Sequence, residues 1–119
     1  MQGMLRNENG AIVCESCTLA RDPLTRMRGL LGRRSLAEGE GLLLQPAGSI
    51  HTFFMRFPID AVFLDGDRRV LRVVPSVRPW RTAAVRKARA VLELAAGEAA
   101  RVGMQTGTVL RLEMDDERQ

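Results

Sequence analysis

Short apolar runs separated by turn residues constrain this sequence more than any other feature. The clearest example is a hairpin over residues 61–75, in which Asp65-Gly66 divides two apolar runs. Asp–Gly is a favoured two-residue turn because both of its positions need a positive φ. Closely spaced strands favour a sandwich or barrel over a layout of strands alternating with helices. The same pattern predicts a hairpin over residues 2–17 and strands at residues 42–44, 50–57, 90–94 and 108–114.

Two short helices complete the predicted secondary structure. Asp22 and Pro23 predict a helix start, because Asp caps free N–H groups and Pro fits the first helical position. Gly32 predicts its end, and a second helix is expected over residues 97–102. Residues 77–89 are interpreted as a basic stretch that is loop-like or weakly helical. We therefore predict a mainly β (α+β) fold, a small antiparallel barrel or sandwich with two short helices.

The length of the chain fits one domain over residues 1–119, with a frayed tail at residues 115–119. Apolar residues make up 45% of the sequence, which is ordinary for a globular protein, so folding requires neither disulfides nor a metal. No apolar run approaches the roughly 20 residues that span a bilayer, and no signal-peptide pattern is present. We expect a monomeric, cytoplasmic protein with no cofactor and no membrane contact.

Basic residues outnumber acidic residues by 18 to 14, and every basic residue except Lys87 is an arginine. Arginine suits two-point recognition of phosphate or carboxylate groups. Four phenylalanines, one tryptophan and no tyrosine weaken a model in which nucleic-acid bases stack on the protein. The arginines predict a solvated basic surface or, as an alternative, a nucleic-acid-binding surface. Two clusters stand out, one of Arg26, Arg28, Arg33 and Arg34, the other of Arg78, Arg81, Arg86, Lys87 and Arg89.

The segment from His51 to Asp60 is the leading candidate for a functional site. His51 is the only histidine, and histidine is the side chain that titrates near neutral pH. An extended strand would place His51 and Met55 on one face and Arg56 on the other. Asp60 precedes an apolar run and is expected to need a partner, such as Arg26 or Arg56. These residues predict an anion-binding site, an acid–base pair, or a structural role in which Asp60 bonds backbone N–H groups of the turn after Pro58.

Cys14 and Cys17 have the spacing of half a zinc site or of a redox pair. A zinc site would need two more ligands, and side chains three positions apart on one strand point to opposite faces. We therefore expect ordinary packing, with metal or redox chemistry as a weak alternative. Trp80, between Pro79 and Arg81, would anchor a ligand or partner, or close one end of the core.

Four strings of residues resemble the uncharacterised bacterial and archaeal family called domain of unknown function 192. They read RMRGLLGR, HTFFMRFPID, FLDG and VLELAAG, and they lie at residues 26–33, 51–60, 63–66 and 91–97. Their order and spacing match over residues 10–113, nearly the whole chain. The resemblance implies a compact, mainly β domain with small helices and no established activity. A function based on Cys14 and Cys17 would be peculiar to this chain.

The function that we predict is a non-enzymatic binding or accessory module. Its ligand would be a small anion or an acidic segment of a partner protein. The sequence has no Gly-rich phosphate loop, no GxSxG elbow and no HExxH pair, which argues against the common enzyme classes. An enzyme with an Asp60–His51 acid–base pair and a nucleic-acid-binding protein are the alternatives. The residues predicted to bind the ligand are Arg26, His51, Met55, Arg56, Asp60 and Trp80.

Overall fold

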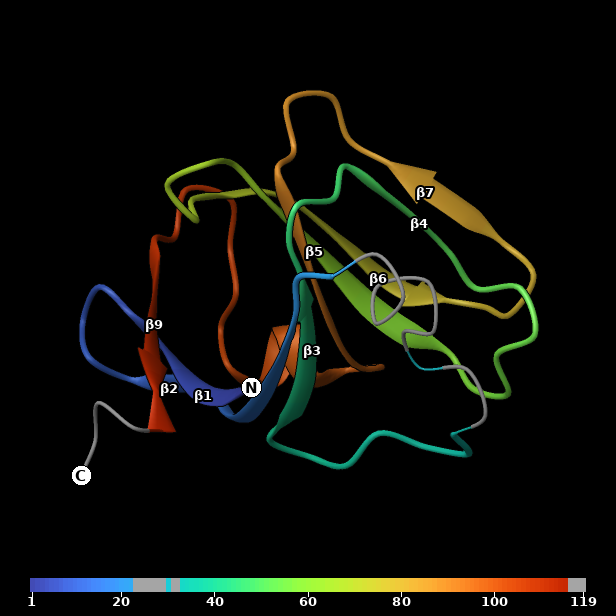
Figure 1. Ribbon diagram of the computed structural model, residues 1–119, viewed down its shortest axis with the longest axis horizontal. Helices are drawn as coiled ribbons and strands as arrows, with labels where there is room; N and C mark the ends of the chain where they lie inside the picture. The colour runs from blue at the N-terminus through green and yellow to red at the C-terminus, as the bar shows by residue number, and fades with distance from the viewer. Residues whose placement is uncertain (23–29, 31–32, 116–119) are drawn as a thin grey trace.

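The computed structural model describes residues 1–22, 30 and 33–115 (Figure 1). The described residues form nine strands and one short helix. In chain order these are β1 (Gln2–Asn7), β2 (Ile12–Ala20), β3 (Glu40–Leu44), β4 (Ser49–His51), β5 (Ile59–Leu64), β6 (Val70–Val77), β7 (Thr82–Ala84), β8 (Ala90–Ala95), α2 (Glu98–Arg101) and β9 (Leu110–Met114).

Seven of the strands form one sheet in the order β6-β5-β8-β3-β2-β1-β9, and β4 and β7 form a separate two-stranded ribbon. This arrangement confirms the predicted mainly β, sandwich-like class. The pairing of β2 with β3 is parallel, so the sheet is mixed rather than wholly antiparallel. A parallel pair needs a long crossover connection, which residues 21–39 supply. The helix predicted over residues 22–32 falls almost entirely outside the described residues.

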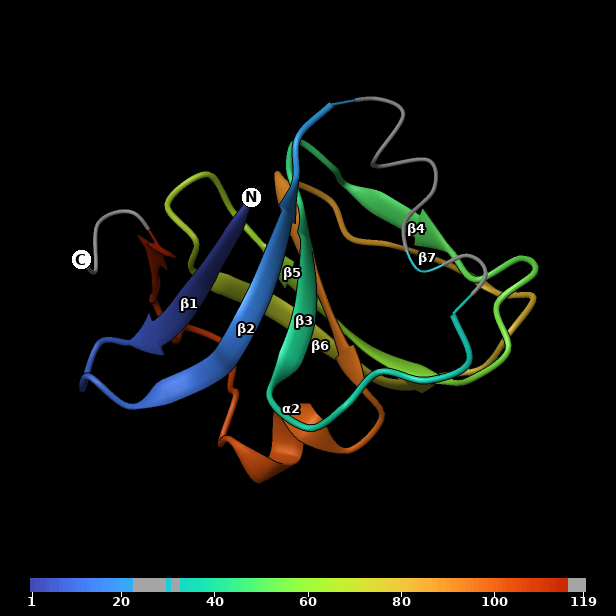
Figure 2. The same ribbon diagram turned by 60° about the horizontal axis from the view of Figure 1, so that its bottom comes forward.

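Each face of the large sheet carries its own hydrophobic core. Leu43, Val62 and Leu92 belong to the first core, and Leu44, Phe63 and Val91 belong to the second. Because β3, β5 and β8 are covered on both faces, their sequences are nearly continuous apolar runs. The second core lies between the large sheet and the β4–β7 ribbon (Figure 2).

The sheet curls until its two edge strands meet at one point. An isolated bridge joins Arg69, just before β6, to Val109, just before β9. The N–H of Val70 also donates to the carbonyl of Thr108 at 2.8 Å. The first core lies inside this curl, which explains why the sequence pattern fitted both a barrel and a sandwich.

Three predicted segments differ in the structure. The strand predicted over residues 50–57 ends at His51, because the chain turns just after it: the N–H of Met55 donates back to the carbonyl of Thr52, and Phe54 has a positive φ of 66°. The β5–β6 turn is longer than two residues, and the residue with positive φ in it is Arg68 (60°), not Gly66. The stretch interpreted as loop-like or weakly helical contains the short strand β7. The second predicted helix is confirmed as α2.

No helix among the described residues is both long enough and apolar enough to cross a bilayer.

Candidate functional site

Asp60 lies on β5 and is sealed inside the domain, with an exposed fraction of 1%. Its Oδ1 accepts the N–H of Ser76 at 2.9 Å, and its Oδ2 accepts those of Gly97 and Ala99 at 3.0 and 2.9 Å. The N–H groups at the start of a helix have no partner within it, so an outside carboxylate satisfies them. Asp60 thus ties β6 to the start of α2. It bonds backbone N–H groups, as the structural hypothesis expected, but these belong to Ser76, Gly97 and Ala99 rather than to the turn after Pro58.

The Asp60–His51 pair suggested by the sequence is not assembled. His51 is exposed at the end of β4, and its ring stacks on Phe53. Both oxygens of Asp60 face backbone N–H groups inside the large sheet. An acid and a base that act together must both reach the reacting atoms. The enzyme alternative therefore loses the geometry on which it depends.

Three of the five phenylalanine and tryptophan side chains gather on two loops, beside the only histidine. The ring centroids of His51 and Phe53 are 5.0 Å apart, and those of Phe53 and Trp80 are 5.8 Å apart. Phe54 meets Trp80 at 4.6 Å with its ring tilted. The exposed fractions are 37% for Phe53, 68% for Phe54 and 55% for Trp80. Exposed apolar clusters of this kind mark interaction sites.

Thr52 holds the two aromatic loops together. It is fully buried, and its Oγ1 donates to the carbonyl of Arg78 at 2.6 Å and accepts the N–H of Arg81 at 2.9 Å. Its own N–H donates to the carbonyl of Arg81, and its carbonyl accepts the N–H of Trp80. The predicted site residue Met55 is buried in the second core and supports the loop from beneath. The rings therefore sit on a preordered support.

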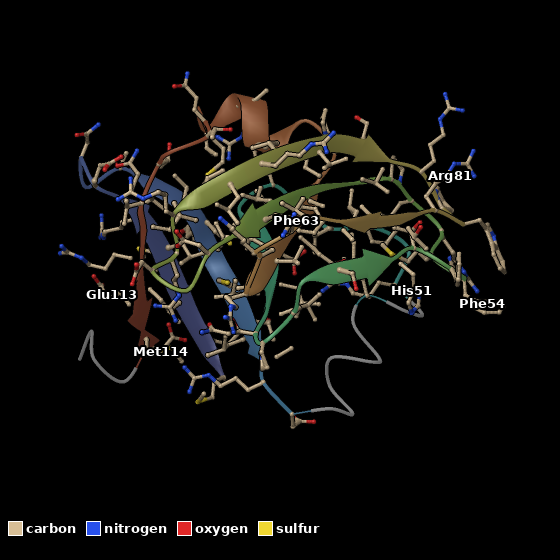
Figure 3. All side chains as sticks on the ribbon, turned by 90° about the horizontal axis from the view of Figure 1, so that it is seen from above. His51, Phe54, Phe63, Arg81, Glu113 and Met114 are labelled. Atoms are coloured by element: carbon tan, nitrogen blue, oxygen red, sulfur yellow. The ribbon has the colours of Figure 1, made fainter. Side chains whose placement is uncertain are left out.

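Three arginines lie on the same two loops as the rings. Arg56, Arg78 and Arg81 are exposed, and none of them forms an ion pair within the described part of the chain. Arg78 and Arg81 also line a shallow hollow of about 370 Å³ beside β6 and β7. In Figure 3, His51, Phe54 and Arg81 lie at one end of the molecule, and Glu113 lies at the other. We define the aromatic loop surface as His51, Phe53, Phe54, Arg56, Arg78, Trp80 and Arg81.

Cys14 and Cys17 both point into the first core, so the expectation of opposite faces was wrong. In the pairing of β1 with β2, Cys17 lies opposite Gly3 and Cys14 lies opposite Leu5. An advance of three residues along β2 therefore corresponds to an advance of two residues along β1. This β-bulge adds one residue between the thiols and turns both inward. A hydrogen bond between them lowers the pKa of Cys14 and raises that of Cys17. No cluster of three His, Cys, Asp or Glu side chains suited to a metal occurs among the described residues.

The structure thus brings His51, Arg56 and Trp80 to one surface, and it separates Asp60 and Met55 from them. Arg26 falls outside the described residues. Phe53 and Phe54 were missed as site residues, although two adjacent phenylalanines in a chain with few aromatics were a usable signal.

Glu93 on β8 was also missed. It interrupts an apolar run, is 3% exposed, and has a pKa that burial raises to about 7.

The family model described as Uncharacterized ACR, domain of unknown function 192, matches residues 4–112. No curated protein matches the chain. One similar crystal structure is that of a putative transcription regulator from Sinorhizobium meliloti; it has a TM-score of 0.84 and 25% identity and covers 94% of both chains. Another is a protein of unknown function from Novosphingobium aromaticivorans, with a TM-score of 0.79, 24% identity, and coverage of 93% of this chain and 84% of that one.

Proposed function

The chain belongs to the family called domain of unknown function 192, as its sequence motifs indicated, and we propose that it is a non-enzymatic binding module. Its ligand is an acidic segment of a partner protein that carries an apolar anchor residue. The observation behind this proposal is that most of the chain's few aromatic side chains are exposed together on two loops joined by Thr52.

The rings supply the apolar part of the contact. Tryptophan and arginine are enriched among the residues that contribute most to binding at protein interfaces. Trp80 touches both Phe53 and Phe54, so an anchor side chain placed there would cover several rings at once. Because Thr52 already fixes the loops, binding costs little conformational entropy.

The arginines supply the preference for an acidic partner. Arg56, Arg78 and Arg81 have no carboxylate bound to them among the described residues, so their charge is available to a ligand. Opposite charges on a partner speed association and exclude basic partners. The net charge of +4 acts in the same direction.

Selection of short random peptides displayed on phage tests this proposal. We expect the peptides enriched on the wild-type domain to combine aspartate or glutamate with an aromatic or large aliphatic residue. Phe54→Ala and Trp80→Ala should each weaken binding of a selected peptide by at least about tenfold, as loss of a central aromatic contact does. Phe54 and Trp80 are both exposed, so neither variant should lose stability through a cavity.

Arg111→Gln is the matched charge control, because Arg111 is exposed on β9, away from the aromatic loops (Figure 1). If Arg111→Gln weakened peptide binding as much as Arg81→Gln does, the binding site would not be confined to the aromatic loop surface. Enrichment of neutral or basic peptides would contradict the acidic partner. Binding of a single-stranded oligonucleotide that falls steeply with salt would favour the nucleic-acid alternative, which agrees with the description of the Sinorhizobium meliloti relative as a putative transcription regulator.

A further inference from the structure

A second basic site lies at the opposite end of the β4–β7 ribbon, where Ser49 pairs with Ala84. Here the β5–β6 turn, the link from β3 to β4 and the link from β7 to β8 meet (Figure 1). The N–H of Arg89 donates to the carbonyl of Leu64 at 2.7 Å, which fixes this junction. The junction borders an open hollow of about 590 Å³ that we call the cationic pocket. Its lining residues are Gln45, Pro46, Gly66, Lys87 and Arg89.

The pocket carries positive charge that the protein does not neutralise. Lys87 and Arg89 are exposed, and neither forms an ion pair within residues 1–22, 30 and 33–115. Asp65 stands beside the lining residue Gly66, but its Oδ1 accepts the N–H groups of Asp67 and Arg69 within the turn. An anion entering the pocket therefore meets two cations that are not held in an ion pair within the described residues, with the carboxylates of Asp65 and Asp67 on the neighbouring turn.

Arg68 does not line the pocket, but it is bonded to a residue that does. Its Nη2 donates to the Oε1 of Gln45 at 3.3 Å, and its enclosed Nε has no hydrogen-bond partner among the described residues. Burial, reinforced by the like charge of Arg21, lowers the pKa of Arg68. Enclosed donors are almost always bonded in native proteins. The guanidinium of Arg68 therefore adds positive charge next to Gln45, one of the residues that line the pocket.

The backbone gives an independent argument for the two basic side chains. Arg68 and Lys87 have φ values of 60° and 72°, in the left-handed region. Glycine and asparagine adopt this conformation readily, whereas longer L side chains are strained in it. Each turn thus keeps a cation where an uncharged residue would fold more easily, a pattern expected of functional positions.

We propose that the cationic pocket binds a small phosphate-bearing anion. Guanidinium groups match phosphate oxygens in two-point contacts, and lysine adds a point charge. A phosphate group carries a charge of about −2. It therefore balances the positive charge of Lys87, Arg89 and the nearby Arg68 better than a single carboxylate would. The site is separate from the aromatic loop surface, so it does not depend on the function proposed above.

Titration of ¹⁵N-labelled protein with sodium pyrophosphate at constant ionic strength tests the site. The amide signals of Gln45, Gly66 and Lys87 should shift and saturate. Arg68→Asn and Lys87→Asn should each weaken binding by at least about fivefold, because each removes a charged donor. Both variants should unfold at the same urea concentration as the wild type or a higher one, because asparagine tolerates positive φ.

Arg111→Gln is again the control and should leave pyrophosphate binding unchanged. Parallel titrations with orthophosphate and adenosine monophosphate distinguish the source of the phosphate, since tighter binding of the nucleotide would identify a nucleotide ligand. The absence of saturable shifts would overturn the proposal. Unchanged binding in both asparagine variants would also overturn it, because the two cations would then serve only the turns.

Discussion

Two buried carboxylates on adjacent strands of the large sheet have opposite environments. Asp60 on β5 accepts three backbone N–H groups, so its charge is well compensated. Glu93 on β8 is 3% exposed, and desolvation raises its pKa from 4.5 to about 7. The burial of Asp60 was open to sequence reasoning, because an Asp before an apolar run needs a partner. Its hydrogen-bond partners could not be predicted from the sequence, because they lie on β6 and at the start of α2, which are distant in the chain.

Replacing Asp60 by alanine should destabilise the domain by about 3–5 kcal/mol, because three backbone N–H groups, of which that of Ala99 is buried, lose their acceptor. Urea unfolding followed by circular dichroism measures this change. Asp67→Ala is the control: Asp67 is exposed and should tolerate the change within about 0.5 kcal/mol. A small effect at Asp60 would show that water or rearranged backbone replaces the carboxylate.

Glu93 should make the stability of the domain depend on pH. Its pKa is raised in the folded state, so the free energy of unfolding should fall as pH rises from about 4.5 through about 7. Glu93→Gln should flatten this dependence and stabilise the protein at pH 8 by up to about 3 kcal/mol. Urea unfolding between pH 5 and 8 provides the measurement. Equal slopes in Glu93→Gln and the exposed control Glu15→Gln would contradict the assignment.

At the scale of elements, the β4 strand shows where sequence patterns stop being sufficient. Residues 50–57 are rich in β-forming residues, yet the strand ends at His51. The chain turns there because Phe54 has a positive φ and the carbonyl of Thr52 accepts the N–H groups of Met55 and of the distant Trp80. The bulge that turns Cys14 and Cys17 to one face escaped prediction for a similar reason, since it depends on the register with β1. Local patterns report an element's type, whereas its ends depend on distant partners.

Thr52→Val keeps the shape of the side chain but removes the hydroxyl group that joins the two loops. We expect a loss of about 1–3 kcal/mol in unfolding free energy, because the N–H of Arg81 loses a buried acceptor. The fluorescence of Trp80 should change in the folded protein as well, since its loop is released. Thr82→Val, at an exposed position on β7, is the matched control. If both variants behaved alike, the hydroxyl group would not be holding the loops.

At the scale of the whole molecule, the large sheet is a rigid base that carries two basic surfaces at the two ends of the β4–β7 ribbon. Four of the five non-glycine residues with positive φ among the described residues belong to these sites. They are Phe54 and Trp80 in one site and Arg68 and Lys87 in the other. The strand content and class were predictable from apolar runs and turns. The surfaces were not, because each combines loops far apart in the sequence.

Trp80 is the only tryptophan in the chain and is 55% exposed, so its fluorescence reports directly on the aromatic loop surface. The most direct test of the proposed function is to titrate the wild-type domain with an acidic peptide obtained by phage selection and to record this emission. We predict a saturable blue shift of the emission. The affinity of the peptide should fall with added salt and when its Asp and Glu residues are replaced by Asn and Gln. If the emission spectrum stayed unchanged while the peptide bound, the peptide would bind elsewhere, and the aromatic loop surface would not be the binding site.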